Sequence, residues 1–376
     1  MPDPAPSPMT NPTDLLPVGL ADRLPAAARA ITLAMRAALD AVEAHGYDRV
    51  RPPLLEFEAS LAARMEGVQT QKMFRFVDPE SLRTLALRSD ITPQVGRIAA
   101  TSLADAPRPL RLAYCGDTAL IVAGELDPAR ERLQLGAELI GADTVAAASE
   151  IVRVAIEACQ AAGLTGLSVD FTLPDLIDTL AAQDLSMAPE TLEAIRRELD
   201  TKDAGGLKAV GGGAYLPLLY ATGPFAEALS ALRAIDAGGA LGTRLDGLEA
   251  IAASVPGDVR ITLDPTERHG FGYQSWFGFT LYASGVRGAA GRGGTYTIAG
   301  SKEAATGFTL YVARVAGATP KPEVERKVYL PLGHDPARAA QLRAEGWRTC
   351  AQLADGEDAA ALGCTHALDS GEVRAL

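Results

Sequence analysis

A chain of 376 residues is long enough for about two or three domains. It has 35 lysines and arginines against 47 aspartates and glutamates, and a net charge of −12 without any basic run gives no electrostatic footprint for nucleic acid. No apolar run approaches the roughly 18 residues that cross a membrane, and the N-terminus lacks a secretory signal pattern, so we expect a cytoplasmic protein with no membrane partner.

The cysteines give no sign of a metal site or a disulfide framework. None of the four forms a C-x-x-C pair, and no histidine lies at metal-ligand spacing from Cys115, Cys159, Cys350 or Cys364. We therefore expect small buried side chains in a reducing compartment, with no metal and no cofactor.

The N-terminal segments predict a tail, a helix and short strands. Residues 1–13 are proline-rich and predicted to be disordered. Apolar residues recur on one helical face over 25–44. The segment 46–56 predicts a short strand that Pro52 and Pro53 confine to an edge or a kink. A short helix and two strands around a turn at 79–81 follow.

The next part alternates helices with long strands. A helix beginning at Asp90 is indicated by the possible caps Asp90 and Thr92 and by Pro93 in its first turn. The stretches LRLAYCGDTAL (110–120) and RERLQLGAELIG (130–141) predict two strands joined by a long loop, and residues 143–162 predict another helix.

In the second half, the pattern changes to helices and then returns to strands. Residues 175–255 are Ala/Leu-rich stretches broken by glycines, which predict a helical insertion and no sheet. Strands are expected at 259–266, 277–285 and about 295–298, and GFTLYVARV (307–315) predicts a strand running into a helix. After a proline-containing linker at 319–322, the pattern predicts a small β-α-β unit with one further strand.

Strand pairs that lie close in sequence favour antiparallel pairing, and hence an α+β fold. We expect a disordered tail at 1–13, a core at 14–318 that contains the helical insertion, and a small α/β C-terminal domain at 323–376. No glycine-rich phosphate loop is present, because Gly211-Gly212-Gly213 follows a helix and lacks the rest of a nucleotide motif.

These segments, in this order, resemble the catalytic cores of class II aminoacyl-tRNA synthetases, and of histidyl-tRNA synthetase in particular, over most of residues 14–315. RVRPPLLE resembles the first class II motif, with Pro53 at the family's proline, and RERLQLGAELIG resembles the second, with Gln134 and Glu138 in its Q-x-G-x-E positions. RHGFGYQSWFGFTLYASG resembles the histidine-specific block, and GFTLYVARV resembles the third motif. The resemblance implies an antiparallel sheet flanked by helices and a homodimer through the core.

Several positions depart from the synthetase pattern. The second-motif arginine falls at Leu120, the histidine-specific arginine at His269, and the glycine under the adenine at Tyr311, while Arg314 keeps the third-motif arginine. Other motif positions are occupied by Gly272, Gln274, Thr295 and Thr297. Adenylate formation builds negative charge at phosphorus, and losing one fixed donor typically costs ~2.7–4 kcal/mol of transition-state stabilisation. We therefore expect no competent adenylation site and no catalytic residue.

A synthetase-like core that lacks these phosphate-binding motif residues resembles the family of regulatory subunits of ATP phosphoribosyltransferase. DITPQVGR (90–97) and the C-terminal LRAEGWRTCAQL and LGCTHAL resemble that family's versions of these segments. The resemblance implies a partner, the short-form catalytic subunit, which this chain would activate in the first step of histidine biosynthesis and help to couple to histidine feedback. A divergent histidine–tRNA ligase, or another enzyme that activates an amino acid, is the alternative.

The resemblance implies that part of the synthetase's amino-acid pocket is retained. Asp90 stands where the synthetase has glutamate, Gln134 and Glu138 lie four apart on one face of a strand, and Tyr273 occupies the first tyrosine of the histidine-specific block. Two carboxylates and an amide could hold the ammonium group of L-histidine, and an ordinary buried polar network is the alternative. Arg88 and Arg97 could pair with these acids or face solvent, and we assign them no role.

Overall fold

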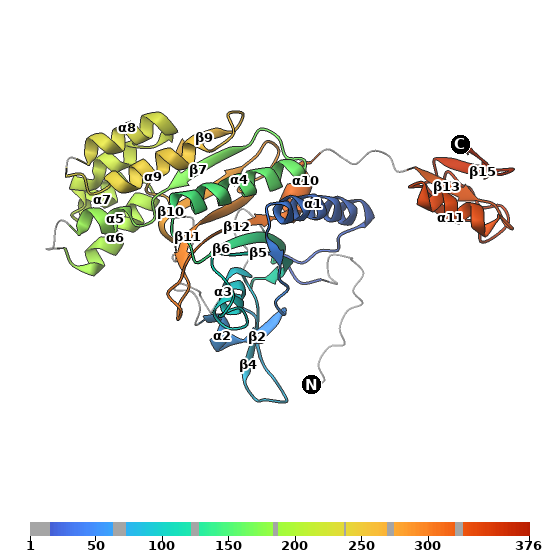
Figure 1. The fold of residues 1–376 in the computed structure, drawn as a ribbon, viewed down its shortest axis with the longest axis horizontal. Coiled ribbons are helices and arrows are strands. Elements are labelled where there is room, and N and C mark those ends of the chain that lie inside the picture. The colour runs from blue at the N-terminus through green and yellow to red at the C-terminus, as the bar shows by residue number, and fades with distance from the viewer. Residues whose placement is uncertain are drawn as a thin grey trace, which may run out of the picture. The chain divides into compact units, whose positions relative to one another are not determined.

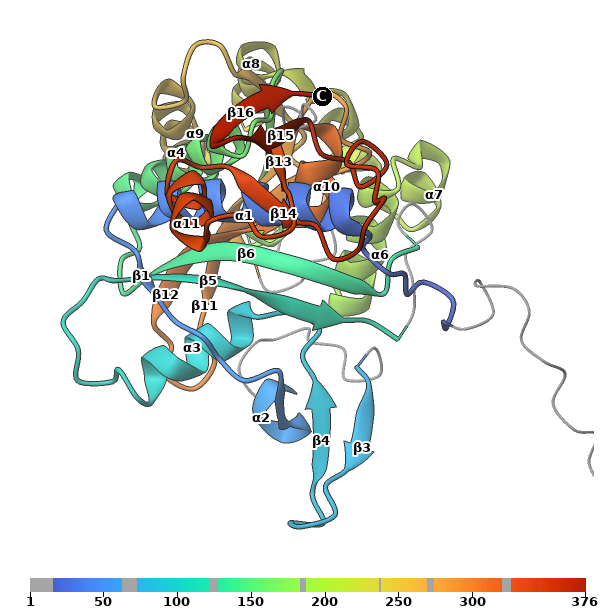
Figure 2. The same ribbon diagram turned by 90° about the vertical axis from the view of Figure 1, so that its right-hand side faces the viewer.

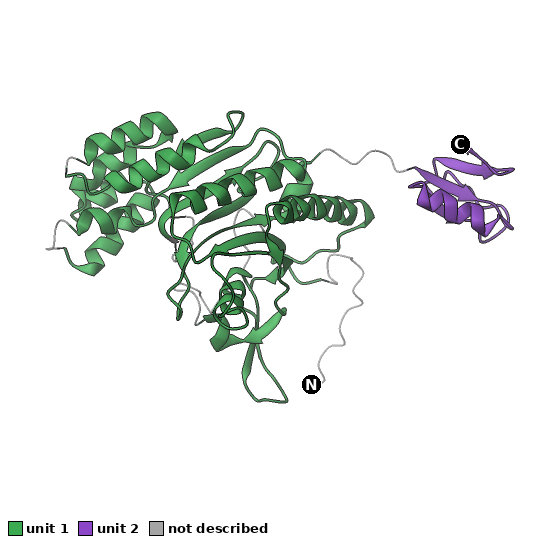
Figure 3. Cartoon of the chain, in the orientation of Figure 1, with its two compact units in different colours: residues 1–319 green, residues 320–376 purple. Residues whose placement is uncertain are grey.

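The computed structural model describes residues 16–62, 73–121, 128–182, 187–236, 238–268, 274–319 and 326–376. The chain divides into two compact units, residues 1–319 and residues 320–376, and each is described by itself (Figure 3). The tail expected to be disordered at 1–13 lies outside the described residues. The expectation of an α+β fold built on a largely antiparallel sheet is confirmed.

The first unit is organised around one nine-stranded sheet with the strand order β1-β5-β6-β12-β11-β10-β7-β9-β8. The pairs β1–β5 and β7–β9 are parallel and the others are antiparallel. The strands span β1 Asp48–Arg49, β5 Leu110–Ala119, β6 Glu131–Ile140, β7 Ser168–Thr172, β8 Gly223–Pro224, β9 Arg260–Leu263, β10 Gln274–Tyr282, β11 Gly291–Thr297 and β12 Ala304–Tyr311.

One face of the sheet is covered by the helices α1 (Pro25–Ala44), α4 (Val145–Ala161) and α10 (Val312–Ala318), which lie together in Figure 1. In α1 the buried residues Ala34, Ala38 and Val42 recur every four positions, so one stripe of the helix packs on the core. The N-terminus of α4 is capped by the side chain of Thr144, which accepts a hydrogen bond from the amide of Ala147.

The opposite face carries α3 (Thr92–Ala100) over a second, smaller core that includes Ile91, Val95, Tyr114 and Tyr296. Beside α3, the helix α2 (Glu58–Ala62) accompanies a three-stranded sheet of order β2-β4-β3, and Figure 2 shows β3 and β4 projecting as an arm. These strands span β2 Leu55–Phe57, β3 Arg75–Val77 and β4 Thr84–Leu87.

The insertion between β7 and β9 is mainly helical. Its elements are α5 Leu176–Ala181, α6 Pro189–Asp200, α7 Ala204–Ala209, the 3-10 helix η3 Gly213–Tyr220, α8 Phe225–Ile235 and α9 Gly242–Ala253. The segment was expected to be helical and not a sheet, and the exception is β8, which pairs with β9 and forms the edge of the large sheet. A two-residue strand is too short to show a period of two, and proline is tolerated where β8 forms the edge.

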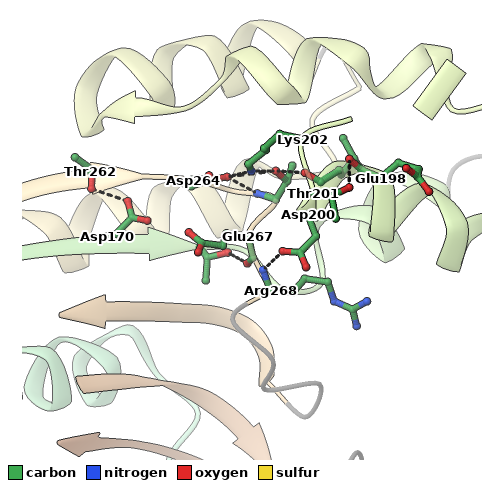
Figure 4. Close-up of polar contacts among 12 residues, drawn as sticks. Asp170, Glu198, Asp200, Thr201, Lys202, Thr262, Asp264, Glu267 and Arg268 are labelled. Atoms are coloured by element: carbon green, nitrogen blue, oxygen red, sulfur yellow. Dashed lines mark hydrogen bonds and ion pairs between the residues drawn. The ribbon is translucent and has the colours of Figure 1, made fainter. Parts of the chain in front are cut away.

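A polar joint ties the insertion to the end of β9 (Figure 4). The Lys202 Nζ donates to Asp264 Oδ1 at 2.6 Å and to Thr266 Oγ1 at 2.6 Å. The backbone amide of Arg268 donates to Asp200 Oδ1 at 2.9 Å. The insertion therefore fixes the stretch of chain that leads into the histidine-specific block.

The second unit is a four-stranded sheet of order β14-β13-β15-β16 packed against α11 (Pro336–Ala344). The central strand β13 is parallel to both neighbours. Its strands span β13 Lys327–Leu330, β14 Arg348–Ala351, β15 His366–Asp369 and β16 Glu372–Ala375. We did not expect β16, which follows β15 through a tight turn in which Ser370 and Gly371 both have positive φ.

Candidate functional site

Three of the four residues expected to hold a ligand lie together on the α3 side of the sheet. Gln134 and Glu138 are on one face of β6, and Asp90 lies just before α3. The Gln134 Nε2 donates to Asp90 Oδ1 at 2.7 Å and to Thr309 Oγ1 at 2.9 Å. Its Oε1 accepts a hydrogen bond from the amide of Ile91 at 3.0 Å. The amide of Gln134 thus joins β6, β12 and the start of α3.

Glu138 is almost completely buried, with 1% of its surface exposed. Its Oε2 accepts a hydrogen bond from the Tyr296 hydroxyl at 2.8 Å, and its Oε1 accepts one from the Tyr114 hydroxyl at 3.2 Å. Burial raises the pKa of Glu138 to about 8, although the hydroxyl donors act in the opposite direction. The raised pKa favours the protonated carboxyl, and an adjacent cation would favour its ionisation.

Two glycines make room for this carboxyl and its partners. A Cβ at Gly307 would lie 1.7 Å from Glu138 Oε2, and a Cβ at Gly136 would lie 2.4 Å from the Tyr114 hydroxyl. Gly307 is opposite Glu138 in the pairing of β6 with β12. Both positions therefore require glycine because of close approach, without any need for positive φ.

Arg88 has a structural position that sequence reasoning missed. It is buried, and its guanidinium donates to the carbonyls of Asp117 at 2.7 Å and Pro52 at 3.0 Å and to Gln94 Oε1 at 3.3 Å. Arg97 pairs with Glu56 at 2.5 Å. Neither arginine pairs with Asp90 or Glu138, and no short motif signals these long-range contacts.

The structure describes only some of the other motif positions. Tyr273, His269 and Gly272 lie outside the described residues, as does the side chain of Gln274. Thr295 is buried, and its Oγ1 accepts a hydrogen bond from Ser275 Oγ at 2.8 Å. That hydroxyl belongs to an internal polar contact between β10 and β11.

Arginines from three segments lie beside Tyr311, and one of them, Arg314, is the arginine expected from the third motif. Leu120 follows β5, and its amide donates to the carbonyl of Arg130 at 2.8 Å. Tyr311 ends β12, with the guanidinium carbons of Arg314 and Arg132 at 4.8 and 5.7 Å from its ring centroid. Arg23, Arg132 and Arg314 line a cavity of about 240 Å³ beside this ring.

The described residues contain no group of three or more histidine, cysteine or acidic side chains that could hold a metal ion. The four cysteines are free, but only Cys159 and Cys364 are buried. The expectation of burial is wrong for Cys115 and Cys350, which are half-buried on β5 and β14. Within the described part of the chain, no helix is both long and apolar enough to cross a membrane.

Comparison with known proteins shows the family to which this chain belongs. Residues 19–315 match the histidyl-tRNA synthetase family. The ATP phosphoribosyltransferase regulatory subunit of Rhodospirillum centenum is 38% identical over 376 residues, which cover 96% of each chain. The corresponding protein of Paramagnetospirillum magneticum is 39% identical over 366 residues, covering 94% of this chain and 96% of that protein.

Solved structures agree on the fold. A Bacillus halodurans protein described as an ATP phosphoribosyltransferase regulatory subunit/histidyl-tRNA synthetase superposes with a TM-score of 0.80 at 23% identity, covering 95% of this chain and 97% of that one. A chain from the ATP phosphoribosyl transferase complex of Thermotoga maritima gives a TM-score of 0.57 at 14% identity, covering 75% of this chain and 97% of its own length. At these identities the likeness shows the fold.

Proposed function

Because this chain belongs to the histidyl-tRNA synthetase family, and within it to the regulatory subunits of ATP phosphoribosyltransferase, we propose that it binds and activates a short-form catalytic subunit. It is a regulatory subunit of histidine biosynthesis. The observation that carries this function is identity of 38% along 96% of both chains. The same observation favours the regulatory role over a divergent histidine–tRNA ligase.

Activation requires that the chain bind the active form of its partner more tightly than the inactive form. The test is to titrate this chain into a short-form catalytic subunit and follow formation of phosphoribosyl-ATP. The rate should rise to a plateau at a fixed ratio of the two chains, and an unrelated protein at the same concentration should have no effect. No rise at any ratio would reject the proposal.

Feedback coupling is tested in the same mixture. Because histidine can inhibit only through a difference in affinity between two states, added histidine should lower the activated rate more strongly than the rate of the catalytic subunit alone. Equal inhibition in both samples would place the feedback entirely in the catalytic subunit.

The chain itself would have no adenylation activity. Leu120 supplies no charge at the second-motif position, and Tyr311 fills the place of the glycine beneath the adenine. The guanidinium of Arg130, whose backbone pairs with Leu120, donates to the carbonyls of Leu120 at 3.1 Å and Val18 at 3.3 Å. An adenylating site needs fixed donors on the transferred phosphoryl oxygens, and these two substitutions favour a non-catalytic role.

Asp90, Gln134 and Glu138 would bind the ammonium group of L-histidine, with Tyr273 closing over the imidazole. Support comes from the hydrogen bond that joins Gln134 to Asp90 and from the buried Glu138, which lies on the same face of β6 as Gln134. A cation beside this carboxyl would lower its pKa, so histidine binding should release a proton, and the heat measured by calorimetry should change with the ionisation enthalpy of the buffer.

The binding test compares three proteins. The wild-type chain should give saturable heat, Glu138→Gln should abolish it, and Glu227→Gln, at an exposed acid on α8, should retain it. Heat that persists unchanged in Glu138→Gln would move histidine to another site, for example one formed with the catalytic subunit.

A homodimer through the core is supported by the apolar side chains that the arm exposes. Phe76 and Val77 on β3 are 43% and 62% exposed, and Leu82 in the adjoining turn is 79% exposed. Val77→Asp should raise the monomer fraction in sedimentation velocity, whereas Tyr220→Asp, at an exposed position in the insertion, should not. An unchanged dimer fraction in Val77→Asp would exclude the arm as the interface.

Location in the cytoplasm, and the absence of a nucleic-acid partner, remain part of this proposal. The net charge of −12 without a basic run supports the absence of a nucleic-acid partner, and membership of the regulatory-subunit family supports the cytoplasm.

A further inference from the structure

A second cavity, with a volume of about 280 Å³, lies on the face of the large sheet that carries α4. It is placed between the beginning of α4, the beginning of α9 and strand β10. Its wall shares no described residue with the pocket around Glu138, which is on the α3 side of the sheet. The lining residues are Asp143, Thr144, Val145, Thr243, Arg244 and Trp276.

The indole of Trp276 forms an aromatic part of this wall. The pairing of β10 with β11 shifts register between Gln274 and Gly278, an irregularity that can re-aim a side chain. Trp276 packs closely on α9, since a Cβ at Gly247 would lie 3.3 Å from its Cη2. Its ring centroid lies 5.4 Å from that of the buried Phe277. A half-buried indole that is ordered by these contacts offers its remaining surface to a flat apolar group.

The same wall carries one basic and one acidic side chain. Arg244 donates to the carboxylate of Asp175 from Nε at 3.0 Å and from Nη2 at 2.5 Å, so its guanidinium is positioned before any ligand arrives. Among the described residues these contacts use only two of its three nitrogens, which leaves Nη1 for another acceptor. Asp143 is exposed, and no cation in the described part of the chain pairs with its carboxylate. A ligand with both an ammonium group and a carboxylate could therefore be held at two points by charge-assisted hydrogen bonds.

The size and chemistry of the cavity together select the ligand. Pockets for drug-sized molecules usually measure about 300–1,000 Å³, so a cavity of about 280 Å³ suits a smaller molecule. The indole favours a flat side chain, Asp143 favours an ammonium group, and Arg244 Nη1 with the hydroxyl of Thr243 favours a carboxylate. We propose that this cavity binds a free α-amino acid with an aromatic side chain.

Fluorescence of Trp276 gives a signal that is local to this cavity. The chain has two tryptophans, and Trp347 belongs to the second compact unit, so Trp347→Phe leaves Trp276 as the only fluorescent indole. L-phenylalanine is the probe, because it does not absorb where tryptophan is excited, and its titration into this variant should give a saturable change in emission.

Three analogues test each part of the proposed recognition. Phenethylamine, which lacks the carboxylate, and 3-phenylpropionate, which lacks the ammonium group, should each bind about tenfold more weakly or worse, because each loses a charge-assisted contact. L-alanine, which lacks the ring, should give no saturable change.

Variants made in the Trp347→Phe background separate this cavity from other sites and from general charge effects. Asp143→Asn, at an exposed residue, should weaken binding of L-phenylalanine about tenfold, while Asp105→Asn, at an exposed acid beyond α3, should leave it unchanged. Glu138→Gln should also leave it unchanged, because that carboxyl belongs to the other pocket.

The proposal would be overturned by the absence of both a saturable emission change and saturable heat with L-phenylalanine. Equal weakening in the two aspartate variants, or loss of binding in Glu138→Gln, would also overturn it. Phenethylamine binding as tightly as L-phenylalanine would do the same, since the cavity would then recognise a cation alone. None of these results depends on activation of a catalytic subunit.

Discussion

At the scale of single residues, the most constrained group is the carboxyl of Glu138. It accepts hydrogen bonds from two tyrosines in a nearly closed interior, at the point where β12 supplies a glycine. Burial of an acid destabilises its charged form, so this residue is costly to keep for packing alone. That cost favours a ligand-binding role, which the calorimetry described above would test.

Replacing Glu138 by glutamine should alter how stability depends on pH. The folded protein holds the Glu138 proton up to a pKa of about 8, whereas an ordinary glutamate releases it near 4.5. Between these values the folded state binds more protons than the unfolded state, so wild-type stability falls as pH rises, by at most about 1.4 kcal/mol per pH unit. Glu138→Gln removes this titration.

Urea unfolding of both proteins from about pH 5 to about pH 9 measures the effect. The stability of Glu138→Gln relative to wild type should increase up to about pH 8 and then level off. A difference that stays constant across this range would show that Glu138 ionises normally in the folded protein.

The glycine beside this carboxyl should tolerate no side chain. Gly307→Ala places a methyl group 1.7 Å from Glu138 Oε2, which forces the strand or the carboxyl to move. The free energy of unfolding should fall by about 3 kcal/mol or more, at the upper end of overpacking costs. Gly257→Ala, where no atom lies within 4 Å, is the matched control and should change stability by about 0.5 kcal/mol at most. Similar values for both variants would contradict the packing described here.

At the scale of elements, the joint between the insertion and β9 positions the chain that enters the histidine-specific block. Lys202 adopts a left-handed backbone conformation, with φ of 59°, that directs its amine to Asp264 and Thr266. Loss of this partly exposed contact should cost about 1 kcal/mol.

Lys202→Met tests this joint, with Lys208→Met on the exposed face of α7 as its control. Denaturant unfolding should show the loss only for Lys202→Met. Hydrogen exchange should also accelerate at the amide of Arg268, which Asp200 holds. Unchanged protection at Arg268 would mean that the insertion does not order this segment.

The elements that were predictable from sequence are those whose apolar pattern repeats over many residues. The helical pattern located α1 at 25–44, and the third-motif segment was correctly expected to pass from strand β12 into helix α10. By contrast, the single strand expected over 46–56 is divided into β1 and β2, which belong to different sheets, and the two-residue β8 was not expected because no local pattern reveals its pairing with a distant strand.

The site residues were likewise predictable where a local sequence pattern indicated them. The period of two placed Gln134 and Glu138 on one face of β6, and the resemblance to the synthetase indicated Asp90, which accepts a hydrogen bond from Gln134. The arginine cavity was missed because Arg23, Arg132 and Arg314 converge only when three separate segments fold together. Of these three arginines, sequence analysis had singled out only Arg314, through the third motif.

At the scale of the whole molecule, the chain has the fold of the histidyl-tRNA synthetase family. The antiparallel sheet, the helical insertion and the small C-terminal unit are present. We propose that Leu120 and Tyr311 stand where adenylation would require an arginine and a glycine. Our central claim is that this framework now works through binding to another chain, without chemistry of its own.

Histidine-dependent exchange between ATP and pyrophosphate tests this claim most directly, because it detects adenylate formation without requiring tRNA. We predict no exchange above the rate without protein, even at high concentrations of ATP, magnesium and histidine. A histidyl-tRNA synthetase in the same assay supplies the positive control. Exchange by this chain that requires histidine and is lost in Arg314→Gln would contradict the account.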